Sequence, residues 1–298
     1  MRKINKHLYR CNIDKLEITC QFNGEKVKNK LKSSQIGEEN YFGPNDELKI
    51  VRKESSFYEN NFRIMVKDID SNDDVVYRDF GDLFFETYNI YRQNVYIMVS
   101  NKILYNDFLS ALIPEIPEVL ELTFIRISKL DIAMDFNFNV IRPFNSLFKD
   151  EKLHLILNGK KVKTMQERLP NVLTLCTGSR KNPLKNRTPF IKNKNGSLEF
   201  TAYDKNKEIE ESNKTYIQEK LGFDKVYRFE VRAKNYHALK DTFNFLISKN
   251  EVIDDLHLLC LLQDQRTLTE LFELFVDRLF RFTYKRQKVD LLNFLLDT

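Results

Sequence analysis

The chain has 298 residues, of which 42% are apolar and 31% are charged, with a net charge of +5. This apolar content allows a packed core in one large or two modest domains. No apolar run is long enough to span a bilayer, and no apolar run follows the basic residues of the first positions, so the sequence predicts neither a membrane span nor a signal peptide. The scattered cysteines lack metal-ligand spacing and predict the reduced thiols of a cytoplasmic protein; they are Cys11, Cys20, Cys176 and Cys260.

Short segments of alternating polarity predict strands in the first half of the chain. They are Leu16–Phe22, Leu48–Arg52, Phe62–Lys67 and Asn94–Ser100. The polar stretch from Lys26 to Asn45 carries no clear pattern. A helix is predicted to begin at Asn101 and to continue after Pro117, before a long strand over Phe124–Phe136.

The second half mixes helices with further strands. The predicted helices are Ser146–Leu157, Lys207–Leu221, Tyr236–Ile247 and Asp254–Phe282, and the predicted strands are Val172–Cys176, Leu198–Lys205 and Val226–Lys234. Lys181–Gly196 is predicted to be a flexible surface loop. We therefore expect an α+β fold with a mostly antiparallel central sheet flanked by helices and a helical C-terminal portion. Residues 1–235 would form a catalytic domain with a basic loop at 178–197, and residues 236–298 would pack on it.

Three of these strands have one polar face. In the first, Glu199, Thr201, Tyr203 and Lys205 alternate with Leu198, Phe200 and Ala202. In the second, Lys129, Asp131, Ala133 and Asp135 alternate with apolar residues, and in the third Arg228, Glu230, Arg232 and Lys234 do so. Two acids two residues apart on one strand face repel each other unless a cation or a basic side chain lies over them.

If the three polar faces belong to one sheet, two interpretations are open. Asp131, Asp135 and Glu230 offer the hard carboxylate oxygens that suit Mg²⁺ or Mn²⁺. Alternatively, the same residues form ordinary salt bridges on a solvent-exposed sheet face. The histidines are far apart in the sequence, so no histidine-pair metal motif is present.

The order of five short motifs resembles the Rep_trans-type replication initiation factor family. The motifs are Ile13–Phe22, Ile127–Phe136, Thr177–Asn182, Leu198–Glu210 and Tyr227–Lys234. The family includes rolling-circle initiators of plasmids and phages and related relaxases of conjugative elements. The chain departs from the family pattern at Ser128 and Lys129, which stand where an arginine usually precedes the first acid, and in a longer insert after Gly178.

The resemblance implies a tyrosine-based DNA nickase that stays linked to the 5′ phosphate and frees a 3′ hydroxyl. It places the nucleophile at Tyr203, with Tyr227 and Tyr216 as weaker rivals. It implies a divalent metal, Mg²⁺ or Mn²⁺, on Asp131, Asp135 and Glu230. Lys205 or Arg228 would offset negative charge near the phosphate, since a phenol with a pKa near 10 needs activation.

Basic residues concentrate between Lys152 and Lys194, where eleven Lys and Arg face a single acid, Glu167. Such a block can neutralise DNA phosphates, although a solvated loop without a partner has the same composition. The residues expected to contact origin DNA, single-stranded or in a hairpin, are Arg180, Lys181, Lys185, Arg187, Lys192, Lys194 and Arg232. A second basic group near the C-terminus is compatible with contact to DNA or to a host helicase, and the resemblance also suggests a homodimer.

Three functions therefore compete. The leading hypothesis is a metal-dependent nickase that initiates rolling-circle replication or, as a relaxase, mobilises an element. The second is a sequence-specific DNA-binding protein on the same scaffold that does not cleave. The third is a nuclease that uses the three acids and water as the nucleophile.

Overall fold

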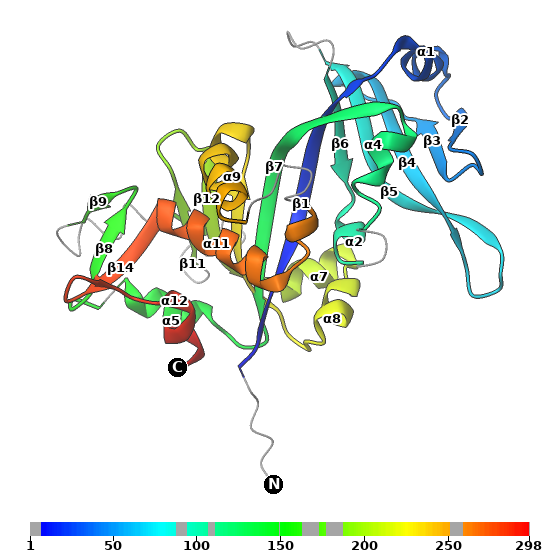
Figure 1. The fold of residues 1–298 in the computed structure, drawn as a ribbon. Helices are drawn as coiled ribbons and strands as arrows, with labels where there is room; N and C mark the ends of the chain where they lie inside the picture. Colours follow the sequence, from blue (N-terminus) through cyan, green and yellow to red (C-terminus); the bar gives the residue numbers. More distant parts are fainter. Residues whose placement is uncertain are drawn as a thin grey trace. The chain divides into compact units, whose positions relative to one another are not determined.

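The computed structural model describes residues 7–87, 94–106, 111–148, 150–162, 173–176, 187–250 and 259–297 (Figure 1). The chain forms two compact units. The first consists of Met1–Asn12, Asp131–Leu246 and Leu261–Thr298, and the second of Ile13–Leu130 and Ile247–Cys260. The two long strands β1 (Tyr9–Phe22) and β7 (Leu122–Phe136) contribute residues to both units.

The first unit contains an antiparallel set of strands that ends beside β7. Its order is β10 (Leu173–Cys176), β11 (Arg187–Lys192), β12 (Leu198–Asp204) and β13 (Tyr227–Ala233), with β7 next to β13. A smaller antiparallel sheet has the order β15 (Gln287–Lys288), β14 (Phe280–Tyr284), β8 (His154–Leu157) and β9 (Lys160–Lys161). The predicted α+β fold with a mostly antiparallel sheet is confirmed.

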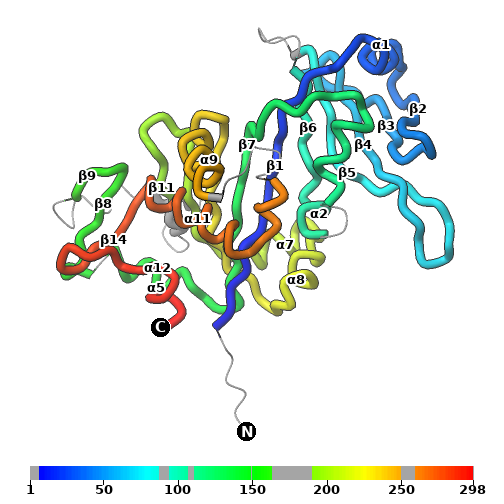
Figure 2. The backbone as a smooth tube through the Cα atoms, viewed as in Figure 1, coloured from blue at the N-terminus to red at the C-terminus, as the bar shows by residue number. Residues whose placement is uncertain are grey.

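Helices accompany both sheets of the first unit. They are α5 (Ile141–Leu147), α7 (Asn206–Ser212), α8 (Tyr216–Leu221), α9 (Tyr236–Asn250), α11 (Gln265–Leu279) and α12 (Leu291–Leu296). Helices α9 and α11 lie side by side (Figure 2), and Arg278 of α11 donates to Ala238 O at 2.6 Å and to Thr242 Oγ1 at 2.8 Å. Helix α11 contacts β12 and β13 through a buried apolar stripe, as its three- and four-residue spacing predicts.

The core of the first unit is aromatic. Phe200 of β12 and Phe229 of β13 lie on one sheet face with ring centroids 5.3 Å apart. Phe144 of α5 packs on Phe229 at 4.8 Å, and Phe280 of β14 packs on Phe200 at 5.0 Å. Because these rings cover the apolar face, the alternating residues of β12 and β13 must point to the opposite face.

The second unit is a meander built on β1. The order continues from β1 through β6 (Asn94–Val99), β5 (Val75–Thr87), β4 (Tyr58–Ile69), β3 (Leu48–Arg52) and β2 (Glu39–Phe42). The helices are α1 (Glu25–Ser33), α2 (Asn101–Leu104) and α4 (Glu115–Val119). Among the described residues, no helix combines the length and the apolarity that crossing a membrane requires.

A bulge in β5 depends on a glycine. Ile64 pairs with Gly81 while Met65 pairs with Asp79, so Phe80 is an extra residue in β5 and its side chain is fully buried. Gly81 has a φ of +156°, and a Cβ there would lie 2.2 Å from Met98 O. The backbone of β6 therefore approaches too closely for any residue with a side chain.

Several predicted elements are wrong. Residues 154–157 form strand β8 rather than the end of a helix, and β11 occupies much of the predicted loop. The helix predicted over 207–221 is interrupted at Asn213, which has a φ of 52°. The last long helix ends at Leu279, where β14 begins, so the C-terminal portion is helical on both sides of a hairpin. Strand β5 was not predicted.

Candidate active site

The polar faces of β12 and β13 meet, as the alternation predicts. Tyr203 lies opposite Arg228, Thr201 opposite Glu230 and Glu199 opposite Arg232. Directly opposed side chains of an antiparallel pair share one face. The pairing therefore gathers a phenol, carboxylates and guanidinium groups on the face opposite the aromatic core.

Tyr203 and Glu230 form the centre of this group. The Tyr203 hydroxyl donates to Glu230 Oε2 at 2.6 Å, and Arg232 Nε donates to Glu230 Oε1 at 2.5 Å. Glu230 is buried and Tyr203 is half-buried. Burial raises the pKa of Tyr203 well above its ordinary value of 10, and the charge of Glu230 adds to this, while Arg228 opposes it. The phenol is thus held protonated, with a carboxylate in position to accept its proton.

Lys205 approaches the same hydroxyl from the start of α7. Its side chain is only 2% exposed, and its Nζ lies 2.6 Å from Glu208 Oε1 and 3.4 Å from Tyr203 Oη. Lys214 also contacts Glu208 Oε1, at 3.1 Å. Burial would raise the pKa of Glu208, but the hydrogen bonds and charges of the two lysines outweigh it and lower the pKa.

Glu208 was not predicted as a site residue. A signal for it exists in the sequence, because Lys205 and Glu208 are three residues apart at the start of a predicted helix, where the two side chains are neighbours. Glu208 accepts from Lys205 and Lys214 through one oxygen atom. It therefore fixes the position of the buried lysine relative to Tyr203.

Asp135 and Arg228 pair with each other in the interior. Arg228 Nε donates to Asp135 Oδ1 at 2.6 Å and Nη2 donates to Oδ2 at 2.9 Å, and both side chains are 0% exposed. This bidentate geometry uses both carboxylate oxygens. Arg228 lies opposite Tyr203, where its charge lowers the pKa of the phenol against the larger effect of burial.

Asp131 lies on the same strand face as Asp135 and is half-buried. The charge of Asp131 raises the pKa of Arg232, as the charges of Glu230 and Tyr203 also do. Burial would lower the pKa of Arg232, but the hydrogen bond to Glu230 and the charges of Glu230, Tyr203 and Asp131 raise it. Arg232 is thus a cation between the carboxylates of β7 and β13.

The fit of a divalent metal to these residues is partial. No group of three His, Cys, Asp or Glu side chains in the described part of the chain is arranged to hold a metal ion. Asp135 does not fit, because both of its oxygens are held by Arg228, whose side chain is 0% exposed, whereas Arg232, the arginine partner of Glu230, is 41% exposed. Asp131 and Glu230 fit by chemistry, and Thr201 Oγ1, buried opposite Glu230, has no hydrogen-bond partner among the described residues. These three residues supply the oxygen ligands that Mg²⁺ and Mn²⁺ prefer.

Other predicted residues lie in different environments. Glu199, on the polar face of β12, is buried and pairs with Lys234 at 2.6 Å. Tyr227 begins β13 opposite Asp204, and Tyr216 begins α8. Tyr203 is the tyrosine whose hydroxyl lies 3.4 Å from Lys205 Nζ.

The predicted DNA-binding residues divide into two groups. Arg180, Lys181 and Lys185 lie outside the described residues. Arg187 is the first residue of β11, and Lys192 and Lys194 are exposed at its end. Arg232 belongs to the Tyr203 site, where Glu230, Tyr203 and Asp131 act on it.

No family model and no curated protein matches the chain. Among solved structures, it is similar to a rolling circle replication initiator protein from Geobacillus stearothermophilus. The identity is 12%, the alignment covers 97% of this chain and 96% of that one, and the TM-score is 0.48. The function of the chain is therefore inferred from its own residues.

Proposed function

We propose that this protein nicks one strand of DNA by tyrosine transesterification and so initiates rolling-circle replication. The observation that carries the proposal is the 2.6 Å hydrogen bond from the Tyr203 hydroxyl to Glu230 Oε2, with Lys205 and Arg232 beside it. A nucleophile, a proton acceptor and two cations are the groups that phosphoryl transfer requires. The order of the five sequence motifs supports the same chemistry.

In the proposed reaction, Tyr203 Oη attacks a backbone phosphorus of DNA. The phenolic proton passes to Glu230 Oε2, the new bond joins Oη to the 5′ phosphate, and the bond from phosphorus to the 3′ oxygen breaks. The 3′ oxygen leaves with a proton from solvent as a free hydroxyl. Lys205 and Arg232 would stabilise the negative charge on the non-bridging oxygens. Asp135 would act through Arg228, whose charge favours the phenolate.

A bound Mg²⁺ or Mn²⁺ would polarise the phosphodiester. Asp131, Glu230 and Thr201 are the residues that would hold it. Because Glu230 accepts from Tyr203 and Arg232 in the described state, metal binding at this site requires a change in the position of Arg232.

The test is a covalent adduct assay on the full chain. Single-stranded and hairpin oligonucleotides of random sequence, labelled at the 3′ end, are incubated with the protein and Mg²⁺ or Mn²⁺. A nick leaves the labelled 3′ portion joined to the protein in a denaturing gel. We expect Tyr203→Phe to abolish the labelled band and Tyr227→Phe and Tyr216→Phe to retain it.

The outcomes separate the alternatives. An adduct that survives Tyr203→Phe moves the nucleophile to another residue, and cut DNA without attached protein indicates water as the nucleophile. The absence of any adduct, together with retained binding, favours a DNA-binding protein that does not cleave. One observation favours this alternative, since Asp135 and Glu230 already have arginine partners. An adduct formed only on the transfer site of a mobile element would identify a relaxase.

A further inference from the structure

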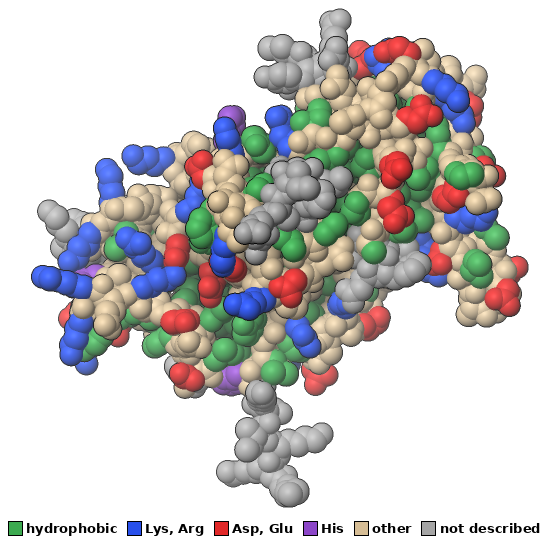
Figure 3. All heavy atoms as spheres, viewed as in Figure 1, with side chains coloured by type: hydrophobic (Ala, Val, Ile, Leu, Met, Phe, Trp, Pro, Cys, Tyr) green, Lys and Arg blue, Asp and Glu red, His purple; other side chains and the backbone are tan. Residues whose placement is uncertain are grey.

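The small sheet of the first unit carries a concentrated positive charge. The segments 154–161 and 280–288, which contain its strands and turns, hold six Lys and Arg residues and no Asp or Glu. They are Lys160, Lys161, Arg281, Lys285, Arg286 and Lys288. Lys and Arg side chains gather at the left of the molecular surface (Figure 3), where Figure 1 places β8, β9 and β14.

The register of the sheet places Lys161, Arg281 and Lys288 on the face opposite its buried aromatic residues, while Lys160 lies in the row of Leu157 and Phe280. Phe280, Phe282 and Leu155 are buried on the inner face. Arg281 lies opposite Ile156, and Ile156 lies opposite Lys161, which forms one row across three strands. A second row on the same face runs from Lys288 through Thr283 to His154. The outer face thus carries basic side chains on the side of the sheet away from the aromatic core.

The turn between β14 and β15 has a backbone conformation that its two residues rarely adopt. Lys285 and Arg286 have φ values of 47° and 71°, so both are left-handed. A two-residue hairpin of this kind favours Asn-Gly, and the β8–β9 hairpin of the same sheet uses Asn158 and Gly159 at 47° and 76°. A residue with a Cβ costs about 1 kcal/mol in this conformation. The chain thus places two basic residues at the tip of the hairpin against its backbone preference.

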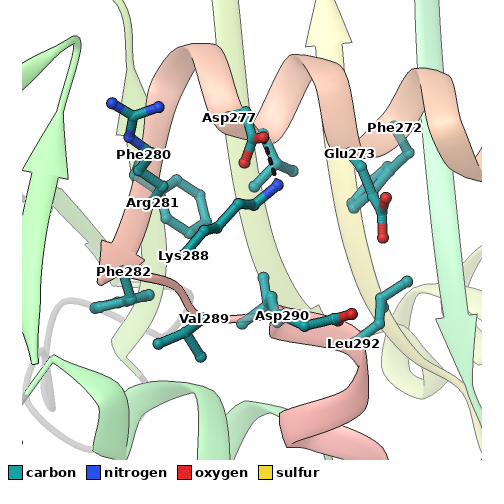
Figure 4. A pocket seen from close by; sticks show the side chains of 12 residues that line it. Phe272, Glu273, Asp277, Phe280, Arg281, Phe282, Lys288, Val289, Asp290 and Leu292 are labelled. Carbon is teal, nitrogen blue, oxygen red and sulfur yellow. Dashed lines mark hydrogen bonds and ion pairs between the residues drawn. The ribbon is translucent and has the colours of Figure 1, made fainter. Parts of the chain in front are cut away.

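Intramolecular ion pairs leave most of this charge available. Lys288 pairs with Asp277 of α11 at 2.5 Å, and both residues line a cavity of about 170 Å³ (Figure 4), so the pair holds the hairpin to the helix. In the same view Arg281 points away from Asp277. Among the described residues, no carboxylate pairs with the other basic side chains, which are Lys160, Lys161, Arg281, Lys285 and Arg286.

We propose that this outer face, the basic hairpin face, binds the phosphate backbone of duplex DNA. Its charges lie along the strands of the small sheet and at the tip of the hairpin, which suits phosphates spaced along a helix. The exposed Tyr284 lies on the other face of β14, with Phe280 and Phe282, and Lys285 Nζ lies 5.2 Å from its ring centroid. A stacking platform for single-stranded bases would need an exposed Phe, Tyr or Trp ring on the basic face itself. The surface therefore positions duplex DNA and does not read bases.

The proposal for the basic hairpin face rests on the proposed nickase function only in that both involve DNA. Binding at this face does not require cleavage. The test uses the full chain carrying Tyr203→Phe, so that the result does not depend on nicking. The decisive variant is Lys285→Asn with Arg286→Gly. It removes both charges while installing the preferred turn, so we expect a raised melting temperature together with weaker DNA binding.

Binding of a short duplex of arbitrary sequence is followed by fluorescence anisotropy between about 50 and about 200 mM salt. Each lost phosphate contact reduces the slope of log Kd against log salt by about 0.9, so the variant should lose about 2. The matched control, Lys26→Gln with Lys240→Gln, removes two exposed charges elsewhere and should keep the slope.

Two results would overturn the proposal. One is an unchanged slope in the Lys285→Asn, Arg286→Gly variant. The other is a loss of binding confined to single-stranded DNA of the same length, because that would make the face a single-strand site. A chain that forms no adduct but loses duplex affinity through this variant would support the basic hairpin face while rejecting the nickase.

Discussion

Asp135 and Arg228 form a bidentate ion pair that is fully buried between β7 and β13. The pair links the strand that carries Asp131 to the strand that carries Glu230. Removing charges from water is costly, and a buried pair is balanced only while both partners are present. The pair therefore fixes the relative position of the two strands behind the proposed nucleophile.

We expect either single replacement, Asp135→Leu or Arg228→Met, to lower the free energy of unfolding by about 3–5 kcal/mol. Each leaves one uncompensated charge in the interior. The double variant should recover most of this loss, since it replaces both charges by apolar groups. Chemical denaturation measures all three. Lys207→Ala, at an exposed pair with Glu211, is the control and should leave stability nearly unchanged. A double variant no more stable than the worse single one would contradict the account.

The raised pKa of Tyr203 predicts a measurable alkaline behaviour. An unfolded tyrosine loses its proton near pH 10, while the native Tyr203 keeps it to higher pH. The native state then binds more protons than the unfolded state, so this contribution to stability is full below about pH 10 and is lost as the pH rises further. We expect Tyr203→Phe to reduce the fall in unfolding free energy between about pH 9 and about pH 11.

Absorbance titration provides a second measurement of the same effect. The tyrosinate signal of the wild type and of Tyr203→Phe should coincide through the range in which ordinary tyrosines ionise. If Tyr203→Phe removed the signal of one tyrosine with a midpoint near pH 10, the pKa of Tyr203 would not be raised by burial.

The lowered pKa of Glu208 predicts a loss of stability in acid, whereas the raised pKa of Tyr203 predicts one in alkali. Its lowered pKa means that the native state keeps it ionised at a pH where the unfolded state, with its ordinary pKa of 4.5, becomes protonated. Its contribution to stability is present above about pH 4.5 and is lost as the pH falls through the native pKa. Glu208→Gln should therefore destabilise the protein at neutral pH and have a smaller effect in acid. Glu210→Gln, at an exposed position of the same helix, is the matched control. Equal effects of Glu208→Gln at both pH values would show that its charge does not matter.

The sequence was most informative for the strands, whose side chains alternate between two faces with a period of two residues. Tyr203, Glu230 and Arg232 were placed on one polar face because side chains of a strand must alternate, and the register of β12 and β13 then follows from burying Phe200 and Phe229. The pairing of Asp135 with Arg228 could not be read in this way. It depends on which strand lies next to β7, and no local pattern specifies that neighbour.

The wrong helix near Leu157 shows a missed local signal. Leu153, Leu155 and Leu157 are two residues apart, which is strand spacing, and Asn158-Gly159 is a strong hairpin signal. Residues 154–157 accordingly pair with β14, which is far away in the chain. Glu208 is a similar case, since its link to Lys205 was visible in the spacing but its approach to Tyr203 depends on tertiary structure.

A measurement of metal binding distinguishes among the carboxylates that the sequence grouped together. If Asp131 and Glu230 hold a divalent ion, calorimetric titration of the full chain with Mn²⁺ should show a site that Asp131→Asn and Glu230→Gln each weaken by about tenfold or more. Thr201→Val should weaken it less, because a hydroxyl is a neutral ligand. Glu208→Gln is the control, since Glu208 is engaged by two lysines and should leave Mn²⁺ affinity unchanged. Equal binding in Glu230→Gln would place any metal elsewhere, and the proton-accepting role of Glu230 would then stand alone.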